Sequence, residues 1–235
     1  LAILDGDAAR SLALHRLLDA FFGDHLDRLL ADHFPRLFPV YLGGDQLLLF
    51  GPWQEALDAI LRLRRDLAAL VGNLLTFSAG LALEPPVARL CSQGQQAAEH
   101  LREARNAGGN RLYALGTAVE WERATSLAER SKALAGWLQQ GSVSPQWVDR
   151  LAALAALRRL GGDHWRPQLA ALVRNASLRS RPARAWAARL AGGGPDSDWP
   201  WLEFLARYAL LSAAESEQLG MKDEESRTER SEGRR

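Results

Sequence analysis

The sequence predicts a mixed α+β fold, in which a ferredoxin-like βαββαβ domain is followed by an all-helical domain. Three observations favour it. Short apolar runs alternate with helix-length amphipathic segments over residues 1–121. Gly43 and Gly44 separate two of these runs, as in a tight hairpin. After residue 121 the pattern is helical. We therefore expect domains at 1–121 and 122–214, and a charged tail at 215–235 that is disordered because it has few apolar side chains.

The first domain is expected to contain eight elements, each bounded by a change of periodicity or a turn signal. In order, they are a strand over 1–4, a helix over 8–32, hairpin strands over 37–42 and 47–50, a helix over 53–71, a strand over 75–83, a helix over 87–106 and a strand over 111–115. Pro39 indicates a bulge or an edge position, because proline cannot donate a ladder hydrogen bond. Gly72 ends the second helix. The helices would cover one face of a mainly antiparallel sheet.

The second domain is expected to be helical throughout. Its predicted helices span residues 122–140, 144–160, 164–175, 182–191 and 199–214, and glycines separate most of them. Ser144 and Pro145 are typical of a helix start, with serine as the N-cap and proline at the first helical position.

Composition limits the functional classes. The single cysteine, Cys91, excludes an internal disulfide and a cysteine-based zinc site, and the five histidines show no metal-ligand spacing. No apolar run reaches the ~18 residues of a membrane span, and no basic leader precedes an apolar stretch, so we expect a cytoplasmic protein without a membrane partner. Leu1 lies inside an apolar run, so we also expect a fragment or one part of a split protein.

The charge is unevenly distributed. The formal net charge of +1 combines −3 over residues 1–121 with +4 over residues 122–220. Six of the eight tryptophans also follow residue 121. The two halves are therefore expected to present different surfaces.

The hairpin is the candidate catalytic feature. In palm-type nucleotidyl transferases and cyclases, a hairpin places acidic side chains beside an aspartate at the end of the first strand, and the carboxylates hold Mg²⁺. Asp5 and Asp7 would lie at that strand end, and Asp45 at the hairpin tip. Gly43 and Gly44 would let the backbone approach a phosphate. The alternative is an inert hairpin turn with a solvated carboxylate.

Several stretches resemble one family, the large subunit of type III CRISPR effector complexes. Residues 41–53 (YLGGDQLLLFGPW) resemble the GGDD hairpin of its second Palm domain, and residues 75–82 (LTFSAGLA) and 110–116 (NRLYALG) resemble two of its strands. Residues 165–169 (WRPQL), with 174–175 (RN), are similar to a pattern in its C-terminal helical domain. The resemblance covers about residues 1–210 in the family's order.

The resemblance implies an antiviral ribonucleoprotein subunit. In the family, Palm domains bind ATP, and target-RNA binding switches on synthesis of cyclic oligoadenylate at the GGDD motif. The implied nucleotide-binding residues are Gly43, Gly44 and Ser78, and the implied Mg²⁺ ligands are Asp5, Asp7 and Asp45. The implied partners are other CRISPR effector subunits, guide RNA and target RNA, with a separate chain carrying the first Palm domain as a further candidate.

The sequence departs from the family in ways that favour a degenerate cyclase. Gln46 replaces the second aspartate, which removes a full negative charge from a site for a hard divalent ion. Residues 8–10 lead directly into the helix, where the family has an insertion, and no first Palm is present in these 235 residues. We expect a structural subunit with a GGDQ site. The alternatives are an active Mg²⁺-dependent cyclase, in the complex or as a free-standing relative of diguanylate cyclases, and a scaffold unrelated to RNA.

Arginines dominate part of the second domain. Residues 158–189 contain eight arginines and one acidic residue, Asp163. Arginine binds phosphate bidentately, so this segment is a candidate RNA-facing or subunit-facing surface, on which Trp165 and Trp186 would stack. The alternative is that the arginines are ordinary surface residues and the tryptophans belong to the core. The contact candidates are Arg166, Arg174, Arg179, Arg181 and Arg184.

Overall fold

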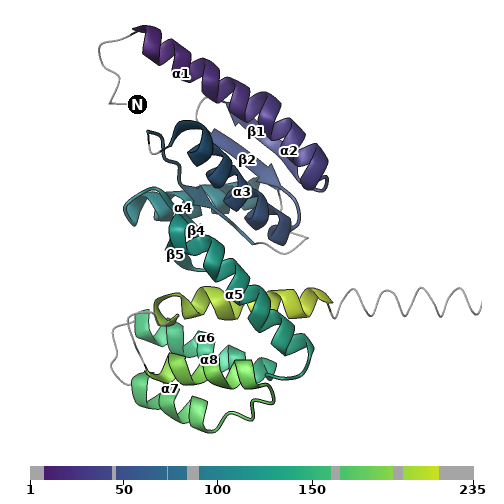
Figure 1. The fold of residues 1–235 in the computed structure, drawn as a ribbon, viewed down its shortest axis with the longest axis vertical. Coiled ribbons are helices and arrows are strands. Elements are labelled where there is room, and N and C mark those ends of the chain that lie inside the picture. Colours follow the sequence, from purple (N-terminus) through teal and green to yellow (C-terminus); the bar gives the residue numbers. More distant parts are fainter. Residues whose placement is uncertain are drawn as a thin grey trace, which may run out of the picture. The chain divides into compact units, whose positions relative to one another are not determined.

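The computed structural model describes residues 8–43, 46–72, 74–83, 90–159, 165–192 and 198–216. Helices and strands alternate in the first half and helices follow, so the fold is mixed α+β, as predicted (Figure 1). The chain divides into two compact units, Leu1–Tyr113 and Ala114–Arg235. This division lies before residue 121, where the charge and tryptophan content change. In the described part of the chain, no helix is long and apolar enough to cross a membrane.

The first unit opens with one long helix, drawn as such in Figure 1. It comprises α1 (Ala8–Ala20), the π-helical turn η1 (Phe21–His25) and α2 (Leu26–His33), which matches the helix expected over 8–32. The π turn was not predicted. There the rings of Phe21 and His25 stack with centroids 5.0 Å apart. His25 Nε2 also lies 3.1 Å from a carboxylate oxygen of Asp66, so the turn is joined to helix α3 (Trp53–Val71).

The predicted hairpin is present, with strands β1 (Phe38–Gly43) and β2 (Gln46–Phe50) pairing antiparallel. Its register shifts between Pro39 and Tyr41, which leaves Val40 as an extra residue on β1. This is the bulge expected from Pro39. The helix that follows, α3, has the predicted bounds and ends where Gly72 adopts a φ of 61°.

Strand β3 is shorter than expected. Only Ala79–Gly80 forms a strand, whereas the sequence indicated 75–83. Helix α4 (Leu90–Asn106) connects β3 to β4 (Arg111–Ala114), and the two strands pair in parallel. The connection through α4 explains why β3 and β4 are parallel, because a helical crossover returns the chain to the same end of the sheet. The ladder joins only two residue pairs, Ala79 with Leu112 and Gly80 with Tyr113, which accounts for the shortened strand.

The described strands form two sheets rather than one. The hairpin β1–β2 is one sheet, and the other has the strand order β3-β4-β5. Strand β5 (Thr117–Glu120) was not predicted, because only four residues separate the Leu115–Gly116 turn from the next helix. The strand expected over residues 1–4, which a ferredoxin-like sheet needs, lies outside the described residues.

In the second unit, the helical prediction is confirmed. The helices are α5 (Trp121–Gln139), α6 (Pro145–Arg159), α7 (Trp165–Arg174), α8 (Arg181–Gly192), the 3₁₀ turn η2 (Trp199–Trp201) and a helix over 202–216. Helix α7 packs against both α6 and α8 (Figure 1). The Ser144 hydroxyl accepts a hydrogen bond from the Trp147 amide at 3.3 Å, as an N-cap does. The last helix continues two residues into the predicted tail, and the rest of that tail lies outside the described residues.

Candidate functional site

The ladder of the hairpin ends at the pair Gly43 and Gln46. The two residues between them in the chain are Gly44 and Asp45. Gln46 is exposed at the start of β2. A Cβ on Gly43 would lie 2.7 Å from the Tyr41 hydroxyl, so the tyrosine side chain covers the space that a side chain would fill. Of the predicted site, Gly43 and Gln46 are therefore placed at the turn.

The carboxylates predicted to bind Mg²⁺ belong to segments that the structure does not describe. Asp5, Asp7, Gly44 and Asp45 lie outside the described residues, so the Mg²⁺ site remains a prediction. Within the described ranges, no group of three or more histidine, cysteine, aspartate or glutamate side chains is arranged to hold a metal ion.

Ser78 lies at the edge of the second sheet. It directly precedes β3, and its hydroxyl is 4.0 Å from the place that a Cβ on Gly109 would occupy. Gly109 and Asn110 form the turn before β4, with φ angles of 69° and 48°. The Asn110 Oδ1 atom is buried and has no hydrogen-bond partner among the residues that the structure describes. Because β3 and β4 are parallel, Ser78 and Asn110 lie at the same edge of the sheet, where both strands begin. This edge can offer a hydroxyl and an amide oxygen to a ligand.

The position of β3 depends on Gly80. A Cβ on Gly80 would lie 2.2 Å from the Leu101 backbone nitrogen, so the strand rests directly on the backbone of α4. The His100 ring lies next to it, with Nδ1 donating to the Leu81 carbonyl oxygen at 2.7 Å. The same ring contacts Tyr113, with centroids 4.9 Å apart. The spacing of the histidines gives His100 no role, although a glycine inside a strand pattern is itself a signal of close backbone approach.

The hairpin carries five large apolar side chains that are exposed. We name them together the apolar hairpin surface. They are between 43% and 61% exposed. Several exposed large apolar side chains on one hairpin are typical of an interaction site. The apolar pattern of the sequence does not predict this exposure, because alternating apolar runs do not show which side chains lack a cover. Its members are Phe38, Val40, Tyr41, Leu42 and Phe50.

The predicted arginine contacts are all on the surface. They lie on α7, on α8 and in the segment between them, and residues 165–192 contain no acidic side chain. The exposed arginines are Arg166, Arg174, Arg179, Arg181 and Arg184. The tryptophans behave differently. Trp186 is buried, and the partly buried Trp165 packs against Trp199 with ring centroids 4.2 Å apart. Trp186 therefore belongs to the core.

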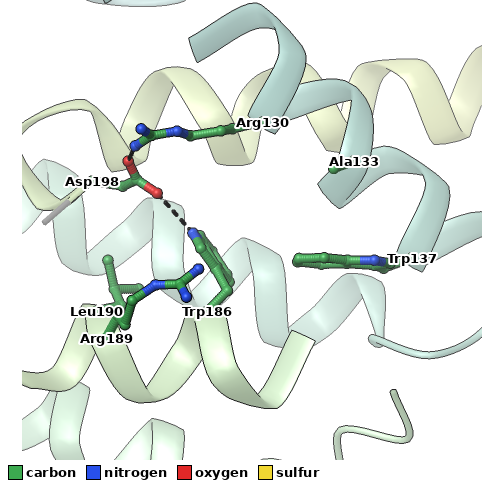
Figure 2. Close-up of a pocket in the computed structure, with 7 residues that line it drawn as sticks. All are labelled: Arg130, Ala133, Trp137, Trp186, Arg189, Leu190 and Asp198. Carbon is green, nitrogen blue, oxygen red and sulfur yellow. Dashed lines mark hydrogen bonds and ion pairs between the residues drawn. The ribbon is translucent and has the colours of Figure 1, made fainter. Parts of the chain in front are cut away.

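The second unit also contains a pocket that the sequence did not indicate. It has a volume of about 350 Å³ and lies between α5 and α8 (Figure 2). Asp198 is buried at its edge, where one carboxylate oxygen accepts from Arg130 and the other accepts from Trp186 Nε1 at 2.8 Å. Arg130 and Asp198 are 68 residues apart, and no local sequence pattern predicts an ion pair between residues so far apart. The lining residues are Arg130, Ala133, Trp137, Trp186, Arg189, Leu190 and Asp198.

Comparison with known proteins gives a consistent result. Residues 3–113 match the family described as Cas10/Cmr2, second palm domain. Two curated relatives are named CRISPR system single-strand-specific deoxyribonuclease Cas10/Csm1 (subtype III-A). The one from Enterococcus italicus is 33% identical over 88 residues, which cover 36% of this chain and 11% of the relative. The one from Thermococcus onnurineus is 30% identical over 82 residues, which cover 35% of this chain and 11% of the relative.

Proposed function

Because residues 3–113 match the Cas10/Cmr2 second palm domain family, we propose that this chain serves as part of the large subunit of a type III CRISPR effector complex. In this proposal the palm is structural, and its GGDQ site does not make cyclic oligoadenylate. The helical second unit corresponds to the subunit's C-terminal helical domain. Guide RNA, target RNA and other effector subunits are the partners.

The observation that supports a structural palm without cyclase activity is the identity and position of Gln46. It is the first residue of β2, pairs with Gly43 and directly follows Asp45 in the sequence. At this position the family's GGDD motif has its second aspartate. An amide can offer one neutral oxygen to Mg²⁺, but it cannot replace the charge of a carboxylate. Mg²⁺ and ATP would therefore be held weakly or not at all.

The apolar hairpin surface supports a protein partner for this unit. Five large apolar side chains on one hairpin remain between 43% and 61% exposed. Covering them would remove apolar area from water, which is the main favourable term in protein association. We propose that the partner is a separate chain that carries a first Palm domain.

The cyclase test compares the wild-type chain with its Gln46→Asp variant in the purified effector complex, with target RNA, ATP and Mg²⁺. We expect no oligoadenylate from the wild type. Gln46→Asp restores the family's second carboxylate. Product from the wild type that disappears with Asp45→Ala would instead support the alternative, an active Mg²⁺-dependent cyclase.

The assembly test is a separate experiment. We expect the chain to co-purify with guide RNA and other CRISPR subunits at low salt. Recovery of the chain alone and free of RNA would refute membership of the complex, and it would favour a scaffold unrelated to RNA.

A further inference from the structure

The pocket in the second unit has an aromatic wall. Trp137 on α5 and Trp186 on α8 meet with ring centroids 6.1 Å apart and an interplanar angle of 56°. The two rings therefore form a corner, in which a flat ligand can stack on one ring and meet the other at an angle (Figure 2). Trp186 is held in place by its hydrogen bond to Asp198, and Trp137 is only partly buried. The corner is thus fixed on one side and accessible on the other.

The charges at the pocket favour an anion. Among the described lining residues, the acidic one is Asp198, and both of its oxygens are already engaged, by Arg130 and by Trp186. Arg189 lines the same pocket and is exposed, and it makes no ion pair within the described part of the chain. In Figure 2 its guanidinium extends toward Trp186. A guanidinium in this setting can bind phosphate bidentately.

The size and surroundings narrow the class of ligand. A volume of about 350 Å³ is near the lower limit of small-molecule sites, which suits one base with its phosphate rather than a larger ligand. Helix α8 also carries the exposed Arg181 and Arg184. The resulting positive field would attract a polyanion.

We propose that this pocket binds a nucleotide. The base stacks on the partly buried Trp137 and meets the buried Trp186 as the fixed wall of the corner, and Arg189 holds the phosphate. The nucleotide is either free in solution or an unpaired residue of single-stranded RNA, since both present the same base and phosphate. The site is separate from the GGDQ hairpin and does not depend on cyclase activity.

The experiment is calorimetric titration of the 235-residue chain with AMP, with ribose 5-phosphate, which lacks the base, and with a five-nucleotide adenosine RNA. We expect saturable AMP binding and about tenfold weaker binding of ribose 5-phosphate, because stacking of one base contributes about that much. RNA that binds more tightly than AMP identifies a strand as the natural ligand, and equal affinity identifies a free nucleotide.

Variants separate the pocket from general electrostatic attraction. Arg189→Ala is expected to weaken AMP binding at least about fivefold, as loss of a charged hydrogen bond does. Arg184→Ala, which removes the same charge from another position on α8, should stay within about twofold. Trp137→Ala should weaken binding about tenfold and Trp137→Phe less, with circular dichroism confirming the fold. Equal binding of AMP and ribose 5-phosphate, equal effects of Arg189→Ala and Arg184→Ala, or no AMP binding at millimolar concentration would each overturn the proposal.

Discussion

Alanine substitutions at Gly80 and Gly94 are expected to shift the stability of the first unit in opposite directions. Gly80 is in strand β3, and Gly94 is in helix α4, which packs on that strand. At Gly94 the nearest atom to an added Cβ is Leu48 Cδ2 at 3.7 Å, an ordinary van der Waals contact. At Gly80 an added Cβ would meet backbone atoms of Leu101, His100 and Ala97 at 2.2, 2.6 and 2.7 Å.

The size of the destabilisation expected for Gly80→Ala follows from the backbone movement that the added Cβ requires. The contact with Leu101 is more than ~1 Å shorter than the ~3.5 Å of an unstrained contact, and a helix backbone cannot rotate away. Relief requires β3 to move off α4, which weakens the hydrogen bond from His100 to Leu81. Overpacking of this kind costs about 1–3 kcal/mol, and the hydrogen bond adds about 1 kcal/mol. Gly94→Ala should instead gain up to about 1 kcal/mol from helix propensity.

Thermal unfolding measures the difference. For a chain of this size, 1 kcal/mol corresponds to ~2–4 °C in Tm, so Gly80→Ala is expected to melt ~4–16 °C below the wild type. Gly94→Ala should melt up to ~4 °C above it. Hydrogen exchange at the amides of residues 97–101 then assigns the loss to α4, because local opening exposes those amides. A Gly80→Ala protein with unchanged Tm and unchanged exchange over residues 97–101 would refute the close packing of β3 on α4.

Two further predictions concern the second unit. Asp198→Ala should lower its free energy of unfolding by about 1–3 kcal/mol, because the buried Trp186 N–H loses its acceptor. Replacing the exposed Asp149 by alanine is the control and should change that free energy by less than about 0.5 kcal/mol. Equal denaturation midpoints for the two variants would contradict the prediction. Arg179→Glu combined with Arg181→Glu should weaken RNA or subunit association and reduce its salt dependence, as measured by co-purification and RNA titration at increasing salt. Unchanged assembly would remove these two arginines from the interface.

The elements that were predictable are those with strong local signals. Helix α3 was predicted residue for residue, because its apolar stripe lies between a proline and Gly72. The bulge in β1 was predicted from Pro39, since proline lacks the N–H that the ladder needs. Strand β3 was overestimated, because the apolar alternation over 75–83 continues beyond the two residues that have ladder partners. Partners from distant parts of the chain carry no local signal.

The same distinction applies to the candidate sites. The turn at Gly43 and Gln46 could be identified from the sequence, because its residues are contiguous. The pocket around Trp137 and Asp198 could not, because its walls come from helices far apart in the chain. Trp186 shows how far residue type alone can predict a role, since a tryptophan is equally suited to stacking on RNA and to packing in a core. Burial and its hydrogen bond to Asp198 decide for the core.

The bulge at Val40 also determines how a partner can approach the hairpin. An exposed strand edge normally invites another strand to add to it, which leads to aggregation. Pro39 provides no N–H along β1, and the bulge next to it interrupts the regular spacing of hydrogen-bonding groups. Open-ended strand addition is thereby discouraged, while the side chains of Phe38 and Tyr41 stay accessible. The hairpin is suited to a partner that packs against its face and stops there.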